Sequence, residues 1–177
     1  NASDDTIEKG FPSIVNNKTW NGMRFTNGID AALYSGEDSV YFFRDNKCIL
    51  FNLNTGKVNP GYPRFISEGD GDIEFPGLPF TKDINEAIYI GKGLARFFKD
   101  NKFVDYSLID RDVQKVGQDI RYISNAFKGL SFNRIDAAVS FYGTDKQFVL
   151  FFKDNKYVEY SLNTKEQKGE SLKNIIE

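Results

Sequence analysis

One block of sequence occurs three times in this chain, at a spacing of about 50 residues. The copies are VYFFRDNKCILFNL from Val40, ARFFKDNKFVDYSL from Ala95 and VLFFKDNKYVEYSL from Val149. Self-similarity at this period is typical of repeat folds, in which each unit buries an apolar face against its neighbours. The repeat therefore constrains the architecture strongly, but it does not identify a ligand.

Each copy of the block predicts a β-hairpin. Aromatic and β-branched residues on both sides of its centre favour two strands. Between these strands the three copies carry Asp45-Asn46, Asp100-Asn101 and Asp154-Asn155. Asp and Asn tolerate left-handed backbone angles, which a two-residue hairpin turn requires. We therefore expect strand, turn and strand in every unit.

A short segment ahead of each hairpin predicts the innermost strand of the unit. These segments are residues 29–32, 84–87 and 135–138, with the sequences IDAA, INEA and IDAA. Small alanine side chains allow strands from several units to approach one axis closely. The third unit has a longer connection to its hairpin, and we expect residues 143–146 to form a loop that holds the extra length.

Short helices are expected at the rim, between the hairpins. Residues 10–15 and 61–66 carry a proline near their start, which suits the first turn of a helix. Residues 119–127 occupy the equivalent place before the third unit, and the tail 171–176 resembles the same element.

The organisation predicted is a single domain over residues 1–177. Its repeats cover approximately residues 10–58, 61–116 and 117–168. Residues 169–177 are expected to begin a further repeat or to form a closing helix.

Three motifs in the second unit occur in the order of a known repeat signature. They are FPGLP at residues 75–79, INEA at 84–87 and FFKDNK at 97–102. The order of these motifs matches the repeat signature of the haemopexin-like family. The chain resembles this family from about Gly10 to the end. The resemblance implies an all-β fold, a small β-propeller of four-stranded antiparallel blades around a narrow channel.

The number of blades differs from the family norm of four, because only three units are legible. The first 28 residues are too short for another complete blade. A fourth blade outside these residues, a blade supplied by a second chain with self-association, and a different closure of the ring all remain open. In the first unit CILF (48–51) replaces FVDY (103–106), which predicts apolar surface on both faces of that strand.

The resemblance also implies a cation site in the channel. In such a propeller the first main-chain carbonyls of the inner strands converge on the axis and offer hard oxygen ligands for calcium or sodium. The matching positions are Asp30, Asn85 and Asp136. The alternative is that the side chains of Asp30 and Asp136 bond to nearby amides at the strand start.

The chain contains no histidine. This removes the usual axial ligand of haem, the commonest zinc ligand and the default general base. Haem is therefore not expected, although ligation by Tyr or Cys48 is open in principle. The sequence also lacks a serine nucleophile elbow, a glycine-rich phosphate loop and a paired-cysteine motif, so we do not expect an enzyme.

Two further features each have a structural and a functional interpretation. The acidic loop at residues 68–74 resembles a calcium loop only in its alternate carboxylates, and we favour a solvated connection. Trp20 and the phenylalanine doublets could stack on a sugar, but a doublet in every unit favours core packing.

Charge and hydropathy exclude several classes of partner. The net charge is −2, with lysines interleaved among acids, so we expect no nucleic-acid partner. Apolar runs are far shorter than the roughly 20 residues of a membrane-spanning helix. The single cysteine cannot form an intrachain disulfide, and the compartment stays open, secretion included.

These observations favour a non-catalytic binding module. Its propeller face or blade edges would hold a protein partner, a surface polymer or a small ligand. The alternative is a carrier of a small ligand, such as a polyamine, haem or a metal, in the channel or on the propeller face.

Overall fold

The computed structural model describes residues 15–113, 119–142 and 147–174. Their strands form three antiparallel sheets, one for each repeat, which we call blades I, II and III. Blade I contains β1 (Ala31–Tyr34), β2 (Ser39–Arg44), β3 (Lys47–Asn52), β4 (Lys57–Val58) and β5 (Arg64–Phe65). Blade II contains β6 (Glu86–Gly91), β7 (Leu94–Lys99), β8 (Lys102–Ser107) and β9 (Arg121–Tyr122). Blade III contains β10 (Ala137–Tyr142), β11 (Gln147–Lys153), β12 (Lys156–Ser161) and β13 (Glu166–Asn174).

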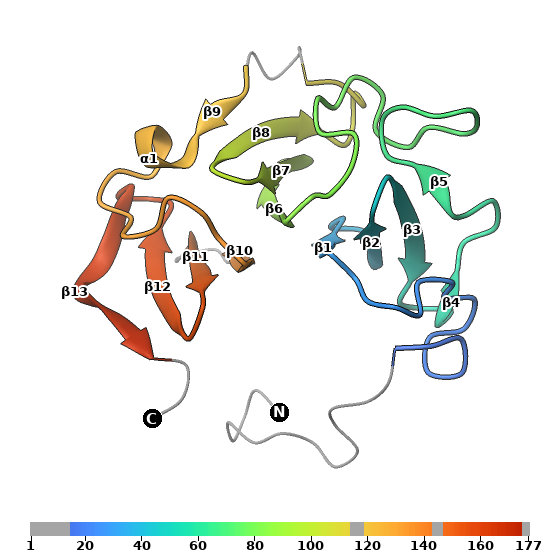
Figure 1. The fold of residues 1–177 in the computed structure, drawn as a ribbon, viewed down its shortest axis with the longest axis horizontal. Coiled ribbons are helices and arrows are strands. Elements are labelled where there is room, and N and C mark those ends of the chain that lie inside the picture. The colour runs from blue at the N-terminus through green and yellow to red at the C-terminus, as the bar shows by residue number, and fades with distance from the viewer. Residues whose placement is uncertain (1–14, 114–118, 143–146, 175–177) are drawn as a thin grey trace.

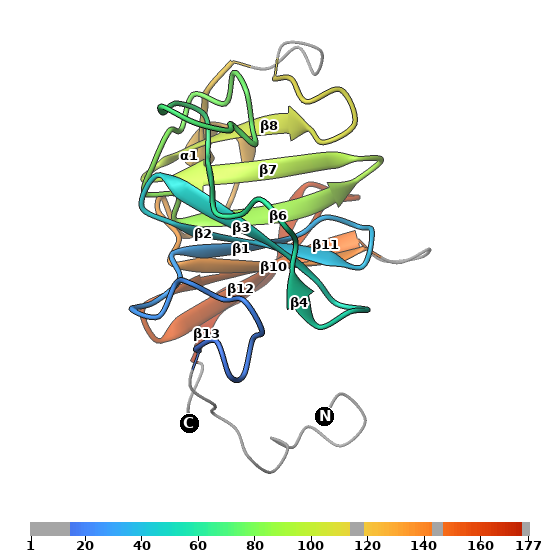
Figure 2. The same cartoon turned by 90° about the vertical axis from the view of Figure 1, so that its right-hand side faces the viewer.

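The blades fan out around their first strands. Figure 1 shows β1, β6 and β10 nearest the centre, with each blade running outward to its last strand. In the edge view of Figure 2 the same three strands lie together at the middle of the molecule. Strand β6 packs between β1 and β10. The all-β fold with antiparallel blades, expected from the sequence, is confirmed. Blades II and III have the expected four strands, and blade I has a fifth because β4 and β5 both pair with β3.

The hairpin turns lie at the predicted positions. Strands β2 and β3 pair up to Arg44 and Lys47, which leaves Asp45 and Asn46 as the turn, and the other blades match. The aspartates that open the three turns have positive φ, at 51° for Asp45, 54° for Asp100 and 55° for Asp154. Asp tolerates this left-handed conformation better than most residues, which explains why each turn begins with it.

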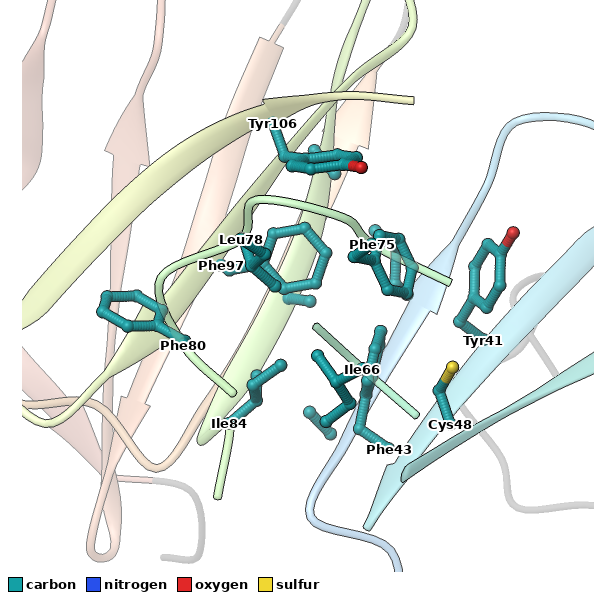
Figure 3. Packing of buried hydrophobic residues seen from close by; sticks show 14 of the residues in the cluster. Tyr41, Phe43, Cys48, Ile66, Phe75, Leu78, Phe80, Ile84, Phe97 and Tyr106 are labelled. Carbon is teal, nitrogen blue, oxygen red and sulfur yellow. The ribbon is translucent and has the colours of Figure 1, made fainter. Parts of the chain in front are cut away.

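Two apolar clusters join neighbouring blades. The cluster between blades I and II is centred on Phe75, whose ring lies 5.0 Å from that of Tyr41 and 5.2 Å from that of Phe97. Figure 3 shows Phe75 between these two rings, with Ile66 and Phe43 below it. The cluster between blades II and III contains the following buried side chains: Ile88, Phe98, Phe103, Ile123, Phe127, Phe132, Ile135, Ala138, Val149, Phe151, Val158 and Tyr160.

A third cluster covers the outer face of blade I. Trp20 packs edge-on against Phe42, at 5.1 Å, and Phe51, at 4.9 Å. Met23 and Phe25 are buried in the same cluster. Core packing of Trp20 is thus confirmed. In β3, Cys48 and Ile49 point to opposite faces and are both fully buried, which confirms the expected apolar surface on both sides.

The predicted rim helices are mostly wrong. Residues 61–66 form no helix, because Arg64 and Phe65 extend along β3 and pair with Cys48 and Lys47. The tail belongs to β13, which pairs with β12, so the helix expected at 171–176 is wrong as far as Asn174. Sheet pairing satisfies the backbone in both places and outweighs the local helix signals.

One helical turn does occur where a helix was expected. Within 119–127 it is confined to α1 (Ile123–Ala126), directly after β9. The predictions for residues 10–14 and for the loop at 143–146 lie outside the described residues. The division into repeats at 10–58, 61–116 and 117–168 stays a prediction. In the described ranges no helix is long and apolar enough to cross a membrane.

Candidate functional site

The three predicted cation-site residues lie together where the inner strands begin. Asp30, Asn85 and Asp136 stand at the starts of the inner strands and line one cavity of about 580 Å³. Asp45, Asp83, Arg134 and Lys153 contribute to the same wall, which is therefore polar and charged with both signs.

The side chains of these three residues bond to the hairpin turns. A carboxylate oxygen of Asp30 accepts a hydrogen bond from the Asp45 amide at 2.8 Å, and Asp136 accepts one from Asp154 at 2.8 Å. The amide oxygen of Asn85 accepts the equivalent bond from the Asp100 amide. Each inner strand is thereby fastened to its own hairpin.

The charge on Asp136 is stabilised in the fold. The hydrogen bond from the Asp154 amide, followed by that from the Lys153 ammonium at 2.9 Å, lowers the pKa of Asp136. Among the described residues, no three His, Cys, Asp or Glu side chains gather as a metal would require. A cation here would therefore depend on main-chain oxygens.

Glu86 lies deeper, between the inner strands. Its carboxylate accepts hydrogen bonds from the Ala87 amide at 2.7 Å and from the Ala138 amide of the next blade at 2.9 Å. Burial raises the pKa of Glu86 to about 7, although the amides of Ala138, Ala87 and Ala32 act in the opposite direction. The sequence placed Glu86 next to the predicted cation-site residues but indicated no role for its carboxylate; the segment reads INEA here, where the other units have IDAA.

Glu74 forms a buried polar network between blades I and II. Its side chain is only 3% exposed and accepts a hydrogen bond from the Tyr41 hydroxyl at 2.8 Å. Arg64 lies 3.0 Å and Arg111 3.4 Å from its carboxylate oxygens, and Arg111 also donates to its main-chain oxygen. Burial, and then the Glu74 charge, raises the pKa of Tyr41. Glu74 thus differs from the solvated loop residue expected at 68–74.

One face of blade III is apolar and only partly covered. Its side chains come from β10, β11 and the start of β12, and we call them the open face: Val139, Phe141, Phe148, Leu150, Phe152 and Tyr157. Val139 is 46% exposed and Phe141 44% exposed. The ring of Phe141 stacks on that of Phe148 at 4.6 Å, so the aromatic surface is continuous.

The positions that correspond to Val139 and Phe152 are buried in the other two blades. Val139 corresponds in register to Leu33 of blade I, 0% exposed, and to Ile88 of blade II, 3% exposed. Phe152 corresponds to Phe43 and Phe98, both fully buried. In blades I and II the next blade covers this face, whereas no described residue does so for blade III.

Comparisons with known proteins agree with the blade geometry. The Hemopexin family model matches residues 29–71. Interstitial collagenase B of Mus musculus is 37% identical over 75 residues, 42% of this chain, and the match spans only 13% of the collagenase. The hemopexin fold protein CP4 from cow pea is 26% identical at a TM-score of 0.58, over 83% of this chain and 68% of that protein. A plant albumin from Cicer arietinum showing hemagglutination is 24% identical at a TM-score of 0.63, over 82% and 68%.

Antiparallel four-stranded blades around converging inner strands define a β-propeller of the haemopexin type. The fold of this chain is thus haemopexin-like.

Proposed function

We propose that this chain is a non-catalytic binding module that recognises a protein surface through the open face of blade III, and that the occupant is a second copy of the chain. The observation that carries the proposal is the exposure of Val139, whose counterparts Leu33 and Ile88 are buried, next to the similarly exposed Phe141. Contiguous apolar surface of this kind marks an interaction site.

The two interfaces within the chain indicate what suits this face. In each interface, the sheet face that corresponds to the open face packs against the opposite face of the neighbouring sheet and against apolar residues of the connecting segment. Between blades I and II these residues are Phe75, Leu78, Phe80, Ile84, Ala87, Phe97, Val104 and Tyr106. Another large apolar β-sheet face is therefore the best match for blade III.

The outer face of blade I limits how two copies can associate. The face of blade I that would pair with blade III in a head-to-tail arrangement carries Phe42, Ile49 and Phe51. Trp20 and Met23 already cover it. Copies are therefore expected to join blade III to blade III, a two-fold arrangement that uses the same patch twice and closes at a dimer.

Val139→Lys tests this arrangement. A lysine at position 139 is tolerated in a monomer, because the side chain is 46% exposed, but it would bury an unpaired charge in the dimer. We expect its dimer dissociation constant to rise about a hundredfold or more. Static light scattering should then give the 20.2 kDa of one chain for the variant and twice that for the unmodified protein.

Leu53→Lys is the matched control. Leu53 is also 46% exposed but lies in the connection between β3 and β4 of blade I. It should leave the dimer intact. Equal masses for the unmodified protein and the Val139→Lys variant would overturn the assignment of the open face.

A channel cation is a second proposal, favoured by the cavity that Asp30, Asn85 and Asp136 share. Their main-chain oxygens would hold calcium or sodium, and the nearby carboxylates would favour a divalent ion. Because a ligand of the folded state stabilises it, calcium at 100 times its dissociation constant should add about 2.7 kcal/mol of stability. Thermal unfolding in calcium, in magnesium and in EDTA measures this. Identical midpoints in all three would contradict the proposal.

A further inference from the structure

A second cavity lies between blades I and II, away from the channel and from the open face. It measures about 450 Å³, within the range of small-molecule sites. Glu74 and Tyr41 form part of its floor, Tyr89 and Leu50 part of its walls, and Ile109 part of its rim. Residues from three separate parts of the chain thus converge on one hollow.

Two glycine turns hold the walls in place. Gly36 has a φ of +86° and approaches Tyr89 so closely that a Cβ would lie 3.2 Å from the ring. Gly93 has a φ of +72°, and its Cβ would meet the Ile109 side chain at 2.4 Å. The Gly93 amide also donates to the Tyr89 hydroxyl at 3.0 Å, which fixes the ring. The cavity is therefore preformed.

The charges around the cavity are balanced. Glu74 is paired with Arg64 and Arg111, and Glu37 adds one acid at the opening. Because both signs are present, neither a strongly anionic nor a strongly cationic ligand is favoured. The Arg111 side chain lines the cavity and is 45% exposed, so its guanidinium can donate hydrogen bonds to a ligand while it contacts Glu74.

The polar groups and the apolar walls suit different parts of one ligand. Ser35, Ser39 and Glu37 offer hydroxyl and carboxylate oxygens, and Arg111 offers donors. Leu50, together with the rings and Ile109, offers apolar surface. A ring with hydroxyl groups at its edge and C–H groups on its face satisfies both.

We infer that this cavity is a binding site for a neutral saccharide of one or two sugar rings. The inference goes beyond the proposed dimer and does not depend on it. Hydroxyl groups both donate and accept, so they match the adjacent carboxylate and guanidinium, while the C–H face of the sugar packs against Tyr89 and Ile109.

The test begins with the unmodified protein. A ¹H–¹⁵N titration with the methyl glycosides of glucose, galactose, mannose and N-acetylglucosamine, and with lactose, should give saturable shifts for at least one probe. The shifted amides should include Gly36, Ser39 and Gly93, which surround the cavity. Absence of saturable shifts with every probe, or shifts confined to other surfaces, would overturn the inference.

Two variants localise the site further. Arg111→Ala removes charge-assisted hydrogen bonds and should weaken binding about tenfold. Ile109→Ala removes part of the apolar rim and should weaken it a fewfold; Ile109 is 76% exposed, so the fold does not depend on it. Leu53→Ala, an exposed leucine outside the cavity, should bind as the unmodified protein does. Unchanged binding in both cavity variants would also overturn the inference.

Discussion

Replacing Phe75 by alanine is expected to lower the free energy of unfolding by about 4 kcal/mol, the usual cost of removing a large aromatic side chain from a core. Phe75 is 2% exposed and contacts rings from both neighbouring blades (Figure 3). It belongs to the connecting segment between the blades, so little else can move in to fill the space. The cavity left behind would separate blade I from blade II.

Urea unfolding tests this expectation and is measured at one fixed protein concentration, because the proposed dimerisation would also affect the midpoint. Leu53→Ala is the control, since its side chain is 46% exposed and lies outside the open face, so its loss should cost about 1 kcal/mol or less. Equal losses for the two variants would show that Phe75 does not hold the blades together.

The stability of the fold is expected to fall as the pH rises from 5 to 8, because of Glu86. Its pKa is raised from 4.5 to about 7 in the folded chain, with burial as the main cause. Between these values the folded chain keeps a proton that the unfolded chain has lost. The stabilisation is therefore complete below about pH 4.5 and is lost by about pH 7. Over pH 5 to 8 the expected decrease is about 2 to 3 kcal/mol.

Two properties of the chain make this change easy to assign. The sequence contains no histidine, so no imidazole titrates in the same range. Glu86→Gln removes the titrating group while it keeps an oxygen acceptor for the Ala138 amide. Urea unfolding across this pH range, with EDTA to exclude metal ions, should give a slope for the unmodified protein and a flat profile for the variant. The same slope in both would assign the pH dependence to other groups.

The repeat made much of the fold predictable from sequence. A strand pair around an Asp-Asn turn is encoded locally, since Asp45 and its two counterparts tolerate the positive φ that the turn needs. Three copies of this unit, each after an inner strand, predicted a repeat fold, and the resemblance to the haemopexin-like family predicted its four-stranded antiparallel blades. The cation-site residues also meet at one cavity, although the cation itself stays a proposal.

What the sequence did not predict depends on contacts between distant segments. Arg64 and Phe65 carry a helix signal, yet they pair with β3, and only the folded sheet provides that partner. Glu74 was assigned to a solvated loop because its partners Tyr41 and Arg111 are 33 and 37 residues away. Val139 and Phe152 of the open face are apolar, as are their buried counterparts in the other blades. Only the structure shows that, among the described residues, none covers this face of blade III.

Sedimentation equilibrium of the unmodified chain, over a wide range of concentrations, tests the central claim most directly. We predict a monomer that converts to a dimer as the concentration rises. The reasons are the exposure of Val139 and Phe141 and the covered outer face of blade I. We expect no species larger than a dimer. The outer face of blade I is covered, and a two-fold contact uses the open face of both copies, so no binding surface is left for a third copy. A chain that stays at 20.2 kDa at every concentration, or one that adds further copies without limit, would contradict the account.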